Sequence, residues 1–365
     1  MKVRLGEVLQ DITKLGTKVT TNKYQKQGDY PIIDQGQKFI AGYLNGHEGL
    51  LEDIPVIIFG DHTRVLKYVD FPFFLGADGV KVLKVKNTNF LTKYVYYNLC
   101  ATAIPNTGYN RHFKWLKQAK LKAIPLETQQ KIINSLDEIT TLIEKYKQQL
   151  EKLDLLVKSK FIEMFGDPVI NPNNWMIKSL LDIGECKNGI NFGASEAGKI
   201  VKCIGVGDIK NLSVIDNNSN VSFVSLNELP SSEYLLQNED IVFVRSNGNK
   251  NLVGRCVIVY PQEEYMTFSG FCIRFRKTTN IIQAQYLLYF LKQQRIRERI
   301  IGRGANIQNL NQKILSSLMI PIPPIELQNE FASFVEQTDK TKSKIKQSLE
   351  KFDILKKALM QKYFG

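Results

Sequence analysis

The pentapeptides Pro-Leu-Glu-Thr-Gln at residues 125–129 and Pro-Ile-Glu-Leu-Gln at residues 324–328 open two copies of one segment. The middle of the first copy, Lys-Tyr-Lys-Gln-Gln-Leu-Glu-Lys-Leu-Asp at 145–154, returns as Lys-Ile-Lys-Gln-Ser-Leu-Glu-Lys-Phe-Asp at 344–353. Phe-Gly closes both copies, and no gap interrupts their alignment. Such a repeat indicates one structural unit used twice, and therefore a pseudo-dimer within a single chain. Many proteins use two-fold geometry to read two DNA half-sites.

Each repeated segment has the pattern of a long amphipathic helix. Apolar residues of the first copy recur at steps of mainly three and four, the seam of a coiled coil, from Ile132 to Met164. Neither Pro nor Gly interrupts this copy before Gly166. The seam of the second copy contains the polar residues Thr338 and Lys342, so uniform pairing is not predicted there. We expect the two helices to pack against each other in antiparallel directions.

Two longer blocks, residues 1–125 and 167–323, precede the helical segments. Their β-rich runs, bounded by Gly, Asn, Asp or Pro, lie at 55–59, 80–85, 240–245, 255–260 and 271–275. Each block ends with an aromatic helix and a polar, Gly-containing loop. The sequence therefore predicts an α+β protein in which mixed α/β domains at 1–125 and 167–323 alternate with helical regions at 126–166 and 324–365.

The composition points to a polyanionic partner. The 365 residues carry a net charge of +13, and almost all of it lies in the two blocks outside the helical segments. The alternative is a basic surface that only confers solubility. The five cysteines are odd in number and lack CxxC spacing, which favours reduced thiols in a cytoplasmic protein. No signal peptide and no membrane-spanning run is recognisable, so we expect no membrane partner.

The order of block, helix, block and helix resembles the specificity (S) subunit of type I restriction-modification systems over the whole chain. The resemblance is strongest at the openings Ile-Pro-Leu-Glu-Thr-Gln (124–129) and Ile-Pro-Pro-Ile-Glu-Leu-Gln (322–328). It implies two target-recognition domains, each reading one half of a split DNA sequence, separated by two long helices packed as an antiparallel coiled coil with pseudo-two-fold symmetry.

The resemblance also implies that the helices dock two modification (methyltransferase) subunits. Whether restriction or translocase subunits join them is left open. The candidate partner-binding residues on the helices are Leu150, Leu153, Val157, Leu349, Phe352 and Leu355.

Gly-containing polar loops supply the candidate residues for reading double-stranded DNA. Arg and Lys can read guanine, and Asn and Gln can read adenine, whereas phosphate contacts position a protein. The candidates in the first block are His62, Arg64, Thr107, Tyr109, Asn110, Arg111 and Lys114. Those in the second block are Arg245, Ser246, Asn247, Asn249, Lys250, Arg303, Asn306, Gln308 and Asn309. The basic run at 292–303 is a candidate for phosphate contacts. For each loop, the alternative is an ordinary polar surface turn.

No catalytic site is recognisable in the sequence. The three histidines lack metal-ligand spacing, no Walker A motif occurs, and the stretch at 171–175 lacks the second proline of an adenine methyltransferase motif. We expect no catalytic residue, metal or cofactor on this chain, with S-adenosylmethionine, ATP and Mg²⁺ on the partner subunits. Two alternatives stay open: a stand-alone DNA methyltransferase or nuclease with a divergent site, and a coiled-coil adaptor that binds only proteins.

Overall fold

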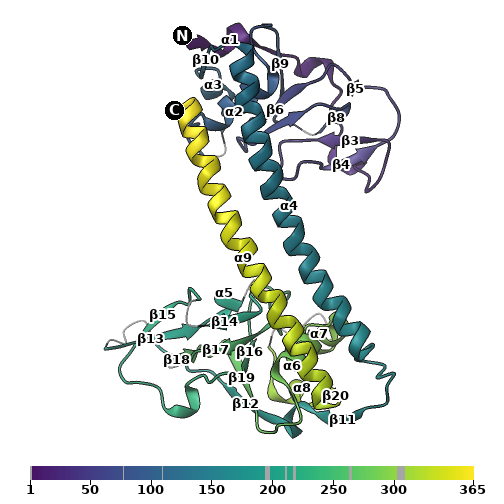
Figure 1. Cartoon of the computed structure of the whole chain (residues 1–365), viewed down its shortest axis with the longest axis vertical. Helices are drawn as coiled ribbons and strands as arrows, with labels where there is room; N and C mark the ends of the chain where they lie inside the picture. Colours follow the sequence, from purple (N-terminus) through teal and green to yellow (C-terminus); the bar gives the residue numbers. More distant parts are fainter. Residues whose placement is uncertain are drawn as a thin grey trace. The chain divides into compact units, whose positions relative to one another are not determined.

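The computed structural model divides the chain into two compact units, which we call unit 1 (Met1–Gln148 with Ile345–Gly365) and unit 2 (Gln149–Lys344). The structure describes residues 2–76, 78–108, 110–193, 198–209, 212–216, 219–262, 265–301 and 309–365. Each unit combines β-sheets, short helices and parts of two long helices (Figure 1). The predicted fold class is thus confirmed. The four domain boundaries inferred from the sequence stay a prediction.

The two repeated segments form the long helices α4 (Leu126–Phe165) and α9 (Ile325–Phe364), each of 40 residues. Each begins directly after a proline and runs without a break, as the uninterrupted helical pattern predicts. Gly166 ends α4 with φ +69°, a left-handed conformation that glycine adopts without steric cost.

Within each unit, the two helices run in antiparallel directions. In unit 2, the ring of Phe161 on α4 packs edge-on against Phe331 on α9, with centroids 5.5 Å apart. In unit 1, Tyr146 stacks on Phe352 at 5.7 Å. The predicted antiparallel pairing is therefore confirmed, and aromatic contacts as well as the aliphatic seam hold it together.

The polar interruption in the second helix is accommodated by an ion pair between helices. Lys342 donates to Asp154 of α4 at 2.7 Å and lies 3.2 Å from Asp339 on its own helix. Burial disfavours the charged ammonium, but these two carboxylates outweigh it and raise the pKa of Lys342. Thr338, which is buried, donates its hydroxyl to the Phe334 carbonyl one turn earlier. Both polar side chains of the seam therefore have hydrogen-bonding partners.

Unit 1 contains two four-stranded sheets and a short two-stranded ribbon, β1 (Lys2–Arg4) with β10 (Lys120–Lys122). The first sheet has the order β2 (Leu9–Asp11), β9 (Val80–Val85), β6 (Val56–Gly60), β7 (Leu66–Val69). The second has the order β4 (Gly42–Leu44), β3 (Tyr30–Ile33), β8 (Phe73–Leu75), β5 (Leu50–Leu51). The short helices are α1 (Leu5–Val8), α2 (Thr92–Ala101) and α3 (Phe113–Leu116), with 3-10 turns at Thr13–Leu15 and Thr21–Lys23.

Unit 2 repeats this plan, with a ribbon of β11 (Met176–Ser179) and β20 (Met319–Ile322). Its larger sheet has the order β12 (Gly184–Asn188), β19 (Cys272–Lys277), β16 (Asp240–Val244), β17 (Cys256–Tyr260), β14 (Val214–Asp216). Its smaller sheet has the order β15 (Phe223–Leu226), β13 (Lys199–Ile204), β18 (Met266–Phe268). The helices are α5 (Val206–Ile209), α6 (Ala284–Leu291), α7 (Gln294–Ile301) and α8 (Gln312–Ser316), with 3-10 turns at Leu180–Asp182 and Ser232–Tyr234.

The two units are copies of one fold. In unit 1 the central strand β6 lies between β9 and β7, and in unit 2 the central strand β16 lies between β19 and β17. In the other sheet, β3 pairs in parallel with β8 just as β13 pairs in parallel with β18. The duplication seen in the helical sequence therefore extends to domains whose sequences resemble each other only weakly.

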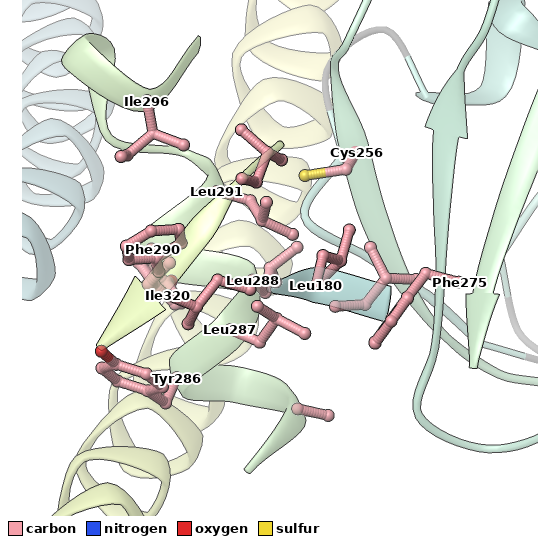
Figure 2. Packing of buried hydrophobic residues seen from close by; sticks show 14 of the residues in the cluster. Leu180, Cys256, Phe275, Tyr286, Leu287, Leu288, Phe290, Leu291, Ile296 and Ile320 are labelled. Carbon is pink, nitrogen blue, oxygen red and sulfur yellow. The ribbon is translucent and has the colours of Figure 1, made fainter. Parts of the chain in front are cut away.

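Both faces of each central strand are buried, and alternate residues enter different cores. Ile241 and Phe243 of β16 pack in the cluster that also contains residues of α4, α6 and α9, whereas Val242 points into the cluster between the two sheets. Figure 2 shows part of the first cluster, in which Leu287 and Leu288 of α6 lie close to Leu180 and Phe275. Burial of each such side chain contributes about 1.5–3 kcal/mol.

A buried glutamine joins each domain to its long helix. Gln129, which is 0% exposed, donates its amide to the carbonyls of Asn89 (2.7 Å) and Ile124 (2.9 Å) and accepts from the amide of Leu91 (2.9 Å). Its counterpart in the second copy of the repeat makes the same three kinds of bond. Gln328 donates to Ile281 and Pro323 and accepts from Gln283. The last residue of the repeated Pro-x-Glu-x-Gln motif is therefore structural.

We expect Gln129→Ala to lower the free energy of unfolding by about 2–3 kcal/mol, because three backbone groups lose their hydrogen bonds to this buried side chain. Gln130→Ala is the matched control, since this neighbour is exposed and bonds only Asn134 among the described contacts; its effect should stay within about 0.5 kcal/mol. Thermal and urea denaturation measure both. Equal stabilities of the two variants would contradict the structural role.

Candidate nucleic-acid interface

Two of the predicted DNA-reading loops come together in unit 1. The chain leaves β6 at residues 61–64, and residues 104–108 and 110–113 return beside it. The amide of His112 donates to the Asp61 carbonyl (2.8 Å), and the amide of Phe113 donates to the Asp61 carboxylate (2.7 Å). Arg64, held at φ +62°, donates its guanidinium to the Ile104 carbonyl (3.4 Å). Loops separated by some forty residues thus form one surface at the end of the central strand.

The buried His112 holds the second of these loops in place. Its Nδ1 lies 3.0 Å from the Asp61 carbonyl, and its Nε2 lies 3.3 Å from the Thr107 hydroxyl. Asn110 donates its side-chain amide to the Thr107 carbonyl. The loop is therefore braced beneath the exposed Arg111, and the exposed Asn110 uses one N–H of its amide within the loop.

Unit 2 brings the corresponding loops together at the end of β16. The amide of Leu310 donates to the Arg245 carbonyl (2.7 Å), and Ser246 forms an antiparallel β-bridge with Asn309. The candidates Arg303, Asn306 and Gln308, like Tyr109 in unit 1, lie outside the described residues. The remaining contacts show that the same pair of loops meets in both units.

A third segment, which the sequence analysis missed, joins each pair of loops. In unit 1 it is the turn between β8 and β9, where the Gly79 carbonyl accepts from the Asp61 amide (2.6 Å). In unit 2 it is the turn between β18 and β19, where the Phe271 carbonyl accepts from the Arg245 amide (2.7 Å). The Phe271 side chain is 64% exposed. A glycine between two β-rich runs marks both turns in the sequence, but nothing there indicates which loops they meet.

The candidate DNA-reading side chains differ in exposure. The exposed ones are Thr107, Asn110, Arg111, Lys114, Asn249, Lys250 and Asn309. The half-buried ones are His62, Arg64, Arg245, Ser246 and Asn247. Of the half-buried group, Arg245 donates its guanidinium to the Gly270 carbonyl (3.2 Å), so it braces the neighbouring turn. Asn247 accepts from the Asn249 amide (2.8 Å), which shapes the loop tip.

Most of the basic run at 292–303 is engaged within unit 2. Lys292 donates to the Ser213 hydroxyl (2.6 Å), and Arg295 forms an ion pair with Asp167. Arg297 donates to the Val253 carbonyl (3.4 Å) and so supports the chain that follows the loop after β16. Burial lowers the pKa values of Lys292 and Arg297. Among the described basic residues of this run, Arg295 and Arg299 are exposed, and Arg295 is the one that is ion-paired.

Metal-binding clusters and reactive thiols would indicate catalytic character among the described residues. Within the described ranges, no cluster of three or more His, Cys, Asp or Glu residues could hold a metal ion. Burial raises the pKa of Cys256 to about 11 and that of Cys203 to about 12, so both thiols stay protonated near neutral pH. None of the described helices has the length and apolar character needed to cross a membrane.

The predicted partner-binding residues on the long helices differ in their burial. Val157 is fully buried in the core of unit 2, and Phe352 stacks within unit 1. Leu150, Leu153 and Leu349 are half-buried, and Leu355 is exposed.

Two exposed apolar pairs stand out on these helices: Leu155 with Leu156 on α4, and Ile354 with Leu355 on α9. The repeat aligns these pairs with each other, so the same exposed apolar site is present once in each unit. Of these four residues, only Leu355 is among the partner-binding candidates predicted from the sequence.

Comparison with known proteins places the chain in a family. The model of the type I restriction modification DNA specificity domain matches residues 1–154 and 172–351, so the chain belongs to that family.

Curated relatives of this family resemble parts of the chain. It is 28% identical over 200 residues to a putative type I restriction enzyme MjaX specificity subunit of Methanocaldococcus jannaschii (53% of this chain, 46% of the relative). It is 26% identical over 195 residues to the EcoR124I/EcoR124II specificity subunit of Escherichia coli (51% and 48%). The StySPI specificity subunit of Salmonella potsdam is 22% identical over 329 residues (83% and 70%). The chain thus spans about half the length of the first two relatives.

Solved structures share the fold. The S subunit of a type I restriction-modification system from M. genitalium superposes with a TM-score of 0.63 at 18% identity, covering 100% of this chain and 96% of that one. A chain from a structural study of complex assembly in the type I R-M system gives 0.58 at 15% identity, covering 100% and 97%.

We expect Asp61→Ala to lower the free energy of unfolding by about 1–3 kcal/mol and to speed hydrogen exchange at the Phe113 amide, which loses its carboxylate acceptor. Asp61→Asn is the control, because the side-chain oxygen that accepts this bond is retained. Hydrogen exchange read by mass spectrometry checks both variants. Unchanged exchange across 104–113 in the alanine variant would show that the two loops are not coupled through Asp61.

Proposed function

We propose that this chain is the sequence-reading subunit of a type I restriction-modification complex, in which unit 1 reads one half of a split DNA site and unit 2 reads the other. The observation that carries the proposal is the repeated loop assembly. In both units, the loop after the central strand meets the loop before the helical region and the turn between the two sheets. Because the loop sequences differ between the units, the two half-sites differ too.

The exposed side chains of these loops suit a DNA surface. Asn110 and Asn249 present amides, which pair with the edge of adenine, and Arg111 presents a guanidinium, which pairs with guanine or a phosphate. The net charge of +13 favours association with a polyanion and makes affinity fall with salt. The braced backbone beneath these side chains supports base reading, because little ordering remains to be done on binding.

Methyl transfer and cleavage would belong to partner subunits in this proposal, and S-adenosylmethionine, ATP and Mg²⁺ would be bound there. The stretch at 171–175, the nearest sequence match to a methyltransferase motif, has a structural role that explains its residues. Asn171 adopts φ +51° and donates its side-chain amide to the Trp175 carbonyl (2.8 Å). Trp175 in turn packs edge-on against Phe165 at the end of α4.

The exposed apolar pairs on the long helices support docking of two modification subunits. Leu155 with Leu156, and Ile354 with Leu355, are equivalent in the repeat, and apolar residues at exposed helix positions are typical of protein interfaces. One site on each unit would bind one copy of the same partner. A pseudo-dimeric chain can thereby place one methyltransferase at each half-site.

The central test is methylation mapping in cells that express the chain with its modification subunits. We expect a split, asymmetric methyladenine motif. Asn110→Ala should relax base choice in one half only and Asn249→Ala in the other, each by about 1–3 kcal/mol of discrimination at a single base pair. Variants that change both halves, or a motif that does not depend on this chain, would refute the assignment of one half-site to each unit.

Partner docking gives a second expected outcome. Leu156→Asp and Leu355→Asp should each remove one of two modification subunits, and the double variant should remove both, because a buried carboxylate opposes an apolar interface. Native mass spectrometry of the purified complex counts the subunits. Lys158→Asp places the same charge on an exposed position of α4 and serves as the control. Full occupancy in the double variant would move the docking site elsewhere.

A further inference from the structure

A buried lysine in unit 1 binds the loop that follows β3. Lys67 lies on β7 and is 4% exposed. Its ammonium donates to three backbone carbonyls of the loop that follows β3: Asp34 (2.8 Å), Lys38 (2.6 Å) and Phe39 (3.4 Å). The Asp34 carboxylate lies 3.7 Å away. All of these partners of the ammonium lie within residues 34–39.

The fold itself does not require a charge at this position. Lys67 pairs across the sheet with Ile58 of β6, and Val257 of β17 pairs with Val242 of β16 in the corresponding place. Val257 is fully buried among apolar side chains. Burying an ammonium is costly, and burial lowers the pKa of Lys67 against the opposing influence of Asp34. Since one copy of the fold works with valine, the lysine in the other is explained by the loop that it holds.

The same loop is attached to the candidate interface through Gln35. Its side-chain oxygen accepts from the His62 amide (3.2 Å), and its amide donates to the Asp78 carbonyl (2.9 Å). Its backbone carbonyl accepts from the Thr63 hydroxyl (2.6 Å). Residues 34–39 therefore meet both the loop after β6 and the turn between β8 and β9.

The tip of this loop presents side chains suited to DNA. Gln37, Lys38 and Phe39 are exposed, and Phe39 (45% exposed) packs edge-on against Phe71 with centroids 6.1 Å apart. Glutamine can pair with the edge of adenine in the major groove, and lysine can contact phosphate. A base-reading amide needs a backbone that does not move, which is what the ammonium of Lys67 supplies.

We propose that residues 34–39 form a further DNA-reading segment of unit 1, in which Gln37 contacts a base edge, Lys38 contacts a phosphate and Lys67 is the positioning residue. This inference rests on the proposed function, and it adds specificity-determining residues on an element remote in sequence from the other loops. Unit 2 holds Val257 at the matching position, so the device belongs to one half-site.

The experiment uses the assembled methyltransferase complex and a pool of duplexes with randomised sequence, sequenced after methylation. Gln37→Ala should lose about 5- to 100-fold discrimination at one base pair of the unit 1 half-site. Lys67→Met should relax choice at that same base pair, because the loop is no longer held. The unit 2 half-site should stay unchanged in both. Lys84→Met, which removes a lysine whose ion pair is with the exposed Asp53, controls for charge and should leave the motif intact.

The outcomes separate this inference from the function on which it rests. A complex that shows no sequence preference in either half would refute the proposed function. A sharp split motif that Gln37→Ala and Lys67→Met leave intact would refute the role of the loop alone. Loss of both half-sites together in Lys67→Met, with a lower melting temperature and an intact motif in Gln37→Ala, would show that the lysine only stabilises the fold.

Discussion

The attachment of each long helix to its domain depends on the hydrogen bonds of two buried glutamines. Gln129 and Gln328 stand at the start of the long helices, and each satisfies three backbone groups of the segments that flank it. A buried amide of this kind fixes both position and angle, since leaving any of its partners unpaired is costly. Tyr94 and Tyr286 reinforce the same joint by donating to the carbonyls of Lys122 and Pro321. Each helix is thereby attached to its domain in one orientation.

The sequence was informative where one local pattern determines the structure. The long helices begin after proline and end at Phe165 and Phe364, because the periodicity is sustained and glycine follows. The central strands β6 and β16 were visible as apolar runs, since both of their faces are buried. The polar interruption in the seam of α9 was harder to interpret from the sequence, because Lys342 is paired with Asp154 of the other helix.

The candidate interface could be predicted only in part. The sequence identified polar loops but not their neighbours, because the pairing of 61–64 with 104–113 depends on tertiary contacts through Asp61 and His112. Residues 34–39 escaped notice for the same reason. A lysine at position 67 within an alternating strand has the appearance of a solvent-facing residue, and only the structure shows its ammonium buried. Arg64 and Arg245 show the opposite case. The sequence predicts that they read DNA, whereas in the structure their guanidinium groups donate to backbone carbonyls.

Unit 1 is built from two segments that lie far apart in the sequence, and this has a consequence for its folding during translation. Its core is closed by Leu359, Met360, Tyr363 and Phe364, which pack against side chains contributed by the first 136 residues. While the ribosome is still translating unit 2, the nascent chain therefore exposes the apolar faces of α2 and the first turns of α4. These apolar faces stay uncovered until α9 has been synthesised, and exposed apolar surface of this kind favours aggregation of a nascent chain.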